Sequence, residues 1–260
     1  MKFLRYIIIA ALTGLLLFRC DVIGEADREI FLEPVEIKKN VLLLDFTDQS
    51  CVNCPRAALE IKNLKSRYGD TLVAVSVHAS PYAYSLVTES GNEYEKYFET
   101  DKLGHPAAVI DGKFRDTNIA GWGGIVINQL TISRPVSIEF DIEINRDSRE
   151  LAISSTIMGI EETSNLSFLL WITEDNIVDC QMISSATVDC EYVHNHVLRA
   201  VINGLWGENI SIDKGEIETL NTTYIINEEW NPENLYIVGF VFDRTTKEVF
   251  QVQEHKIIQE

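Results

Sequence analysis

The segment from Val41 to Pro55, VLLLDFTDQSCVNCP, constrains the fold of this chain more than any other. Its first part, Val41 to Phe46, predicts a buried strand, because an apolar run of strand length is typical of a parallel strand covered on both faces. Two cysteines, Cys51 and Cys54, follow at CxxC spacing, where we expect the chain to turn helical. A CxxC pair between a strand and a helix indicates a thiol-disulfide redox site.

The expected helix start bears on the chemistry of both cysteines. The amide groups and the dipole of a helix N-terminus stabilise negative charge, so Cys51 should ionise more readily than a free thiol, whose pKa is about 8.5. A thiolate is the attacking species in disulfide exchange, and Cys51 is therefore the candidate nucleophile. Pro55 biases Cys54 away from helical backbone angles, which predicts an irregular first turn.

Two further segments carry a resemblance to thioredoxin-like proteins. Asp45 stands six positions before Cys51 in the predicted strand, and residues 104–112, GHPAAVIDG, resemble the segment that holds the cis-proline of this fold. The resemblance implies that Asp45 assists deprotonation of Cys54, a role that would justify burying a carboxylate. It also implies that Pro106 packs against the cysteine pair and presents backbone groups to an extended substrate.

The first 19 residues are typical of a signal peptide. Lys2 and Arg5 precede an apolar run of 13 residues from Tyr6 to Phe18. This run is shorter than the roughly 20 residues that span a bilayer as a helix. Leu17-Phe18-Arg19-Cys20 resembles a bacterial lipoprotein box, which implies lipidation of Cys20, a tether over residues 20–39 and anchoring at the outer membrane. A leader that stays uncleaved or is cleaved elsewhere is the alternative.

The charge composition argues against one class of partner, nucleic acid. The chain carries 22 Lys and Arg against 40 Asp and Glu, a formal charge of -18, and has no basic run. Nucleic acid is therefore not an expected partner, because phosphate binding needs a basic surface. We expect the membrane, through the lipid, and protein thiols or disulfides of the envelope as partners, and we expect no cofactor and no metal.

An α/β domain is predicted over residues 40–133. A helix should run from the CxxC to Gly69, a strand from Leu72 to His78, and a hairpin should turn at Asp111-Gly112. Residues 81–99 form an aromatic insertion with a helix near residues 92–100, whose side chains line a substrate groove or, alternatively, pack under a loop. A glycine cluster at residues 121–124 precedes another helix. Phosphate binding is not expected there, because the Lys-Ser/Thr pair of a P-loop does not follow.

Residues 134–260 have a different pattern. Apolar and polar residues alternate from Val136 to Ile144, and further strands are predicted at residues 151–158, 166–173, 236–243 and 248–255. Strands separated by polar turns, with little helical periodicity, predict an all-β, immunoglobulin-like sandwich as a second domain.

The remaining cysteines and histidines leave alternatives open. Of five cysteines, Cys20 is assigned to lipid, so Cys180 and Cys190 remain as a pair, which we interpret as a structural disulfide. A second redox pair that relays electrons with the CxxC is one alternative, and a zinc site of four cysteines is another. His194 and His196 would share one face of a strand, where they bind a metal or serve as structural histidines.

Residues 172–175, 192–199 and 203–208 resemble the second domain of the outer-membrane protein twenty-eight family of lipoproteins. Members of that family join a lipidated leader, a thioredoxin-like domain and a β-sandwich. Two hypotheses follow. In the first, the chain is a membrane-tethered thiol-disulfide oxidoreductase; in the second, it is a surface binding or adhesin-like module whose CxxC is a permanent structural disulfide.

Overall fold

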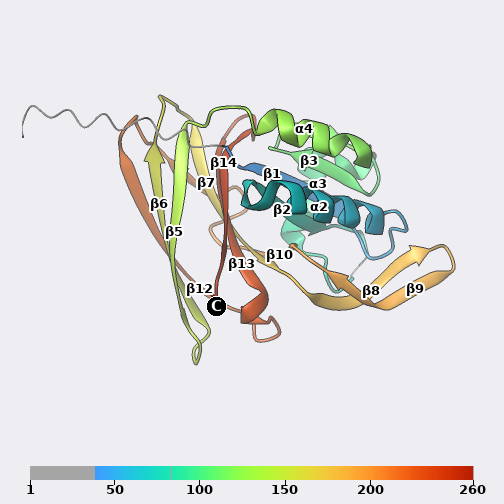
Figure 1. Ribbon diagram of the computed structural model, residues 1–260. Helices are drawn as coiled ribbons and strands as arrows, with labels where there is room; N and C mark the ends of the chain where they lie inside the picture. Colours follow the sequence, from blue (N-terminus) through green and yellow to red (C-terminus); the bar gives the residue numbers. More distant parts are fainter. Residues whose placement is uncertain (1–38, 83, 260) are drawn as a thin grey trace, which may run out of the picture. The chain divides into compact units, whose positions relative to one another are not determined.

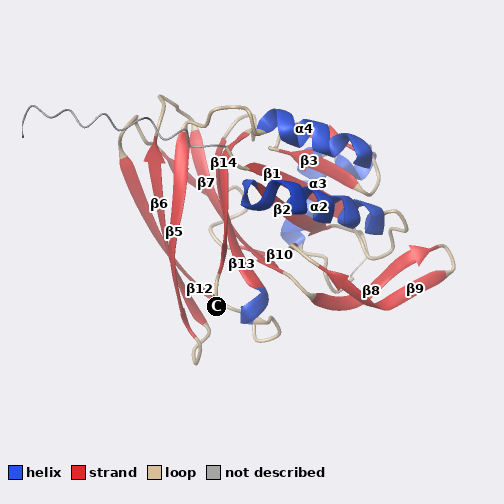
Figure 2. Cartoon of the chain, viewed as in Figure 1, coloured by secondary structure: helices blue, strands red, loops and turns tan. Residues whose placement is uncertain are grey.

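Most strands belong to one mixed sheet. The computed structural model describes residues 39–82 and 84–259, and within them the sheet has the order β14-β13-β7-β10-β2-β1-β3-β4, with β11 paired to β7 (Figures 1 and 2). Its strands are β1 (Val41–Thr47), β2 (Leu72–His78), β3 (Ala107–Ile110), β4 (Phe114–Asp116), β7 (Leu166–Glu174), β10 (Val197–Val201), β11 (Glu208–Ile210), β13 (Leu235–Asp243) and β14 (Val249–Lys256).

Helices cover both faces of the first part of this sheet. They are α2 (Cys54–Tyr68), α3 (Glu89–Phe98) and α4 (Trp122–Gln129), with short 3-10 turns at Gly69–Thr71, Thr100–Lys102, Ile119–Gly121 and Pro232–Asn234. Alternate residues of β1 point to opposite faces. Val41 and Leu43 therefore pack with α2 and α4, whereas Leu42 and Leu44 pack with α3 on the other face.

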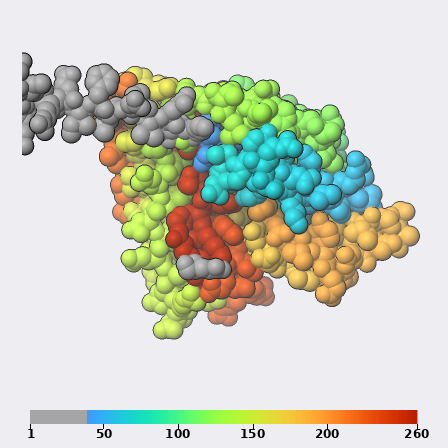
Figure 3. Space-filling view, in the orientation of Figure 1, coloured from blue at the N-terminus to red at the C-terminus, as the bar shows by residue number. Residues whose placement is uncertain are grey.

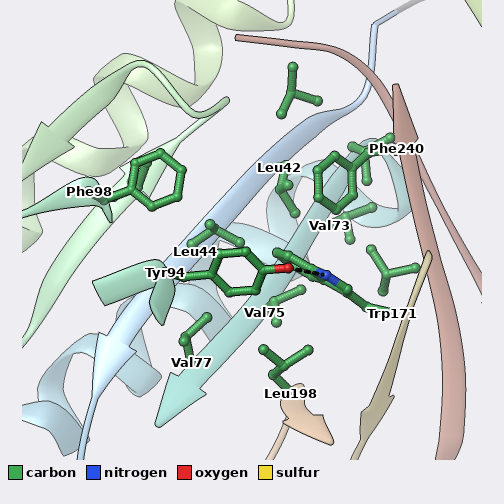
Figure 4. Packing of buried hydrophobic residues seen from close by; sticks show 14 of the residues in the cluster. Leu42, Leu44, Val73, Val75, Val77, Tyr94, Phe98, Trp171, Leu198 and Phe240 are labelled. Carbon is green, nitrogen blue, oxygen red and sulfur yellow. Dashed lines mark hydrogen bonds between the residues drawn. The ribbon is translucent and has the colours of Figure 1, made fainter. Parts of the chain in front are cut away.

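The face covered by α3 holds an aromatic core. Tyr94 of α3 donates a hydrogen bond to the carbonyl of Leu205 over 2.6 Å and accepts one from the indole of Trp171 over 3.2 Å (Figure 4). Trp171 belongs to β7, far along the chain from α3. The buried phenol and indole thus have polar partners, as such groups require, and this core joins the two halves of the chain.

A second, three-stranded sheet lies against the other end of the large one. It contains β5 (Val136–Asn145), β6 (Glu150–Gly159) and β12 (Ile217–Ile225), in the order β12-β6-β5. The inward residues of β5 and β6 form one apolar cluster with β7 and β13. Two facing sheets are present here, as a sandwich requires.

The remaining strands, β8 (Ile177–Ser184) and β9 (Thr187–His194), pair only with each other within the described residues. We call residues 177–194 the arm. Figures 1 and 2 show it extending from the sheet beside the end of α2. The arm was missing from the sequence prediction.

The strand, helix and hairpin predictions for the first half are largely confirmed. Strands β1 and β2, the stop of α2 at Gly69 and the turn at Asp111-Gly112 all lie where expected. The helix of the insertion begins slightly earlier than expected, at Glu89, because Thr88 caps it by accepting a hydrogen bond from the amide of Gly91.

The expectation of a separate sandwich after residue 134 needs correction. Strand β10 lies beside β2, with Val197 opposite Ser76, and β7, β13 and β14 continue the same sheet. Long-range pairing of this kind leaves no local pattern in the sequence, because β10 is short and its neighbour is far away in the chain. The protein therefore has one shared sheet rather than an α/β sheet followed by an independent sandwich.

Candidate functional site

The CxxC lies where the sequence placed it, in the turn between β1 and α2. Cys51 and Cys54 form a disulfide, with Cys51 partly exposed and Cys54 only 3% exposed. The helix begins at Cys54 itself, with Pro55 in its first turn. This corrects the expectation that Pro55 moves Cys54 out of the helix, because a proline is tolerated in a first turn, where its missing N–H has no helical partner to lose.

Asp45 is buried on β1, the strand that leads to the cysteine pair. It points to the same face of β1 as Val41 and Leu43, toward α2, and is 2% exposed. Its Oδ1 atom has no hydrogen-bond partner within residues 39–82 and 84–259. Burial disfavours the charged carboxylate and raises the pKa of Asp45 to about 7, although the charge of His105 acts in the opposite direction.

His105 links the loop before Cys51 to α3. Its Nδ1 lies 3.0 Å from Oδ2 of Asp48, and its Nε2 lies 2.7 Å from Oε1 of Glu95. Burial lowers the pKa of His105, but the hydrogen bonds to Asp48 and Glu95 outweigh this effect and raise it above its usual value. The peptide bond from His105 to Pro106 is cis, as the thioredoxin resemblance implied.

A cavity of about 700 Å³ opens next to the buried side of the cysteine pair. Asp45 and Cys54 contribute to its wall, together with residues of α2, β2 and the arm. His78 and His194 also line it, and their rings meet edge to face at 5.4 Å between centroids. Burial lowers the pKa of both histidines, that of His78 to about 3, so both rings are neutral at physiological pH.

The structure separates the two histidines that we expected on one strand face. His194 is buried at the end of β9, whereas His196 follows the strand with a positive φ of 57° and pairs with Asp175 over 3.1 Å. Among the described residues, no group of three or more His, Cys, Asp or Glu side chains is arranged to hold a metal ion. The contacts of the two rings, His196 with Asp175 and His194 with His78 and Tyr192, fit the structural interpretation.

Cys180 and Cys190 also form a disulfide, which joins β8 to β9 across the arm. All four cysteines of the described chain are thus paired, which contradicts the alternative of a four-cysteine zinc site. The arm contacts the turn before the CxxC. The amide of Met182 donates to the carbonyl of Gln49 over 2.8 Å, and Gln181 Nε2 donates to the carbonyl of Cys51 over 3.0 Å.

Two other candidates lie away from the cysteines. Tyr94 and Phe98 of the aromatic insertion are buried in the core, as the packing alternative predicts for them, whereas Tyr82, Tyr84 and Tyr97 are exposed. Gly123 and Gly124 lie inside α4, so the glycine cluster is not a loop that surrounds a phosphate.

Cys20 and the leader lie outside the described residues. None of the helices within residues 39–82 and 84–259 has the length and apolarity needed to cross a bilayer.

Sequence reasoning missed several residues of this site. His78, Glu95 and Gln181 belong to no recognised motif, and only the fold brings them to the site. Asp48 stands three residues before Cys51 in the sequence, but no role was predicted for it. His105 was noted only as the neighbour of Pro106. His78 lies opposite Thr47 in the parallel register of β2 against β1, a pairing that the sequence alone does not show.

Two solved structures are similar to this chain over most of its length. HBP35 of Porphyromonas gingivalis has a TM-score of 0.68 at 13% identity, over 85% of this chain and 76% of that one. A protein of Agrobacterium tumefaciens has a TM-score of 0.54 at 12% identity, over 85% of this chain and 95% of the other. These likenesses concern the fold alone.

A domain of the outer membrane lipoprotein Omp28 from Porphyromonas gingivalis is 23% identical, with a TM-score of 0.35, over 48% of this chain and 88% of that domain. No curated protein matches the chain. The profile of the family described as "Outer membrane protein Omp28" matches residues 91–260, which is most of the chain. The chain therefore belongs to the Omp28 family and is a protein of the outer membrane.

Proposed function

We propose that this protein is a lipid-anchored thiol-disulfide oxidoreductase of the cell envelope, with a thioredoxin-like site at Cys51 and Cys54. The observation that carries the proposal is the position of Asp45. A carboxyl group with a pKa of about 7 lines the same cavity as the buried cysteine of the pair. A purely structural disulfide has no need of a titratable group that costs stability in this place.

The surrounding fold supports a thioredoxin-like assignment. Strand β1 runs parallel to β2 and antiparallel to β3, and helices lie on both faces of these strands. The CxxC follows β1, and the cis peptide before Pro106 immediately precedes β3. These are the elements on which the resemblance rests, in the same order along the chain.

In the proposed reaction, Cys51 acts as the nucleophile because it is the more exposed of the two cysteines. Its thiolate attacks a substrate disulfide, one substrate sulfur leaves as a thiolate, and a mixed disulfide forms. Asp45 then takes the proton from the Cys54 thiol, and the Cys54 thiolate attacks Cys51. The second substrate sulfur leaves, so that two electrons pass to the substrate and the CxxC disulfide forms again.

Pro106 and His105 have a positioning role in this proposal. The hydrogen bonds of His105 to Asp48 and Glu95 fix the segment before Pro106 relative to the loop that carries Cys51. An extended substrate segment would lie along this backbone. Protein disulfides are the proposed substrate class, since the site is open at Cys51.

Trapping of partners tests the proposal. Cys54→Ser should accumulate mixed disulfides between Cys51 and envelope proteins, because the resolving thiol is absent. Cys51→Ser should abolish reduction of a small aromatic disulfide, and Ser50→Ala serves as the matched control beside it. A Cys54→Ser chain that also carries Cys180→Ser and Cys190→Ser, and that traps nothing in cells although it is folded and present in the membrane, would contradict the proposal.

A second candidate function is a surface binding module. The arm exposes the apolar side chains of Val178, Ile183, Val188 and Val193, between 44% and 57%. Exposed apolar groups clustered on one hairpin are typical of a surface that meets a partner. Binding that persists after both Cys51 and Cys54 are replaced by Ser would favour this candidate over catalysis.

A further inference from the structure

The two disulfides of the described chain lie on either side of one hydrogen-bonded contact. Gln49 Nε2 donates to the carbonyl of Cys180 over 3.0 Å, and the Gln49 carbonyl accepts from the amide of Met182 over 2.8 Å. Gln181 returns a hydrogen bond to the carbonyl of Cys51 over 3.0 Å. The backbone of one cysteine pair is therefore tied, through single residues, to the backbone of the other.

Exposure increases in order along these four cysteines. Cys54 is buried, Cys51 and Cys180 are partly exposed, and Cys190 is exposed. In Figure 3 the arm, in orange, lies directly beside the blue and cyan segment that contains the CxxC. Of the four described cysteines, Cys190 is therefore the one most open to solvent.

The arm is held by contacts that can open locally. None of the buried apolar clusters in the described chain includes a residue of the arm. Ser85 donates a hydrogen bond to Asp179 of the arm. Together with the hydrogen bonds of Gln49 and Gln181, this makes the contacts between the arm and the CxxC turn mainly polar. The arm joins the sheet next to Asn176 and His196, whose φ angles are 59° and 57°. Few buried apolar contacts favour local opening of the arm, although the side chains of Gln181 and His194 are buried. The relay requires such an opening, so that Cys180 can reach Cys51.

We propose that Cys180 and Cys190 are a second redox pair, which exchanges electrons with Cys51 and Cys54. This inference rests on the proposed function, because it requires Cys51 to act as a nucleophile. The arm would then be the relay that the cysteine count alone left open. It would add a second place of contact with an external protein disulfide, at the exposed Cys190.

In this exchange, two electrons pass from the CxxC to the disulfide of the arm. An external dithiol first reduces the CxxC. The Cys51 thiolate then attacks Cys180, the bond from Cys180 to Cys190 breaks, and Cys190 leaves as a thiolate that takes a proton from solvent. Cys54 loses its proton and attacks Cys51, which expels Cys180 as a thiolate. The inner disulfide is restored and the arm holds two thiols, which can reduce a protein disulfide at Cys190.

Two triple variants of the full chain, both with Cys20→Ser, test which sulfurs meet. The first carries Cys54→Ala and Cys190→Ser and keeps Cys51 with Cys180. Its matched control carries Cys54→Ala and Cys180→Ser and keeps Cys51 with Cys190. In graded glutathione buffers, peptide mass spectrometry should find the Cys51–Cys180 disulfide with an effective concentration in the millimolar range, at least about tenfold above that of the control pair.

A measurement on the chain with all four cysteines covers the case in which a variant fails to fold. After mixing with one equivalent of a dithiol, thiols should appear first at the inner pair and then at Cys180 and Cys190, at a rate independent of protein concentration. Gln181→Ala should slow the second step several-fold compared with Ser185→Ala at the exposed tip of the arm.

The outcomes are distinguishable. If Cys51 reduces a small aromatic disulfide but never pairs with Cys180 above the control, the relay is wrong and the proposed function stands. If Cys51 reacts with no disulfide at all, both proposals fall.

Discussion

Burial of the Asp45 carboxyl group lowers the stability of the folded chain but gives the group a pKa that suits a general base. Its carboxyl group is buried without a partner for Oδ1 in the described part of the chain, and burial raises its pKa to about 7. A group with this pKa gains and loses a proton readily at neutral pH, which is the property required of a general base. His105 shows the opposite case, since two carboxylates favour its charged form.

The Asp45 pKa predicts a pH-dependent stability. Between its usual value of 3.8 and about 7, the folded chain holds a proton that the unfolded chain has released. Rising pH therefore lowers the free energy of unfolding across this window, by about 4 kcal/mol in total. Asp45→Asn should remove this loss, so the variant should exceed the parent protein in urea unfolding at pH 8 and match it near pH 4. An equal difference at both pH values would contradict the assignment.

The His105 pKa predicts a stabilisation with its own pH range. The pKa of His105 is higher in the folded chain than in the unfolded chain. Its contribution to the free energy of unfolding is therefore complete below about pH 6.5 and is lost as the pH rises through the pKa of the folded chain. His105→Gln should lower the free energy of unfolding at pH 6 by on the order of 2 kcal/mol, the scale of charge-assisted hydrogen bonds. The difference in the free energy of unfolding between His105→Gln and the parent protein should be smaller at pH 9 than at pH 6. Denaturant titrations at the two pH values measure it, and an equal difference at both would contradict the assignment.

At the scale of elements, the turn between β3 and β4 joins distant segments. The Asp111 carboxylate pairs with Lys39 over 2.7 Å and accepts a hydrogen bond from the amide of Leu42, and the Asp111 carbonyl accepts one from Val249. Gly112 follows with a φ of 67°, and a Cβ atom there would lie 1.9 Å from the carbonyl oxygen of Lys247. The turn and the β13–β14 connection therefore fit only with glycine at this position.

This fit predicts a difference between two glycines. Gly112→Ala should destabilise the protein by at least about 2 kcal/mol, because a positive φ and a backbone clash act together. Gly204→Ala has a comparable φ of 88° but meets no atom within 4 Å, so it should cost only about 1 kcal/mol. Urea unfolding of the two variants measures the difference, and equal losses would show that the close approach to Lys247 is unimportant.

The local elements were largely predictable from sequence, and their assembly was not. Strand β1, helix α2 and the turn at Asp111-Gly112 follow from apolar periodicity and turn residues, which are local signals. The arm escaped prediction because its strands mix exposed apolar and polar residues without a buried face. Asp45, Cys51, Cys54 and Pro106 were found through a motif, whereas His78 reaches the site through the pairing of β2 with β1, and Gln181 reaches it through the arm.

At the scale of the molecule, one sheet crosses the boundary predicted at residue 134. Strand β10 lies beside β2, and the core around Trp171 and Tyr94 contains residues from both halves of the chain. Neither half can bury its apolar surface without the other. The contact between the arm and the CxxC turn is a consequence of this shared sheet, because β7 and β10 hold the two ends of the arm.

The shared sheet predicts a single cooperative unfolding transition for residues 39–259. Calorimetry should give one peak whose calorimetric and van't Hoff enthalpies agree. A fragment that ends at residue 133 should not fold, since the edge of β2 and one side of the aromatic core would be open to water. Two resolved transitions, or a folded fragment, would show that the halves are independent domains.

The reduction potential of the Cys51–Cys54 pair tests the central claim most directly. The full chain with Cys20, Cys180 and Cys190 replaced by Ser would be equilibrated with graded thiol buffers and the two thiols counted by mass spectrometry. A redox-active site predicts a value between about -270 and -120 mV, the range of working oxidoreductases. A value below about -300 mV would mean a structural disulfide and would contradict the account.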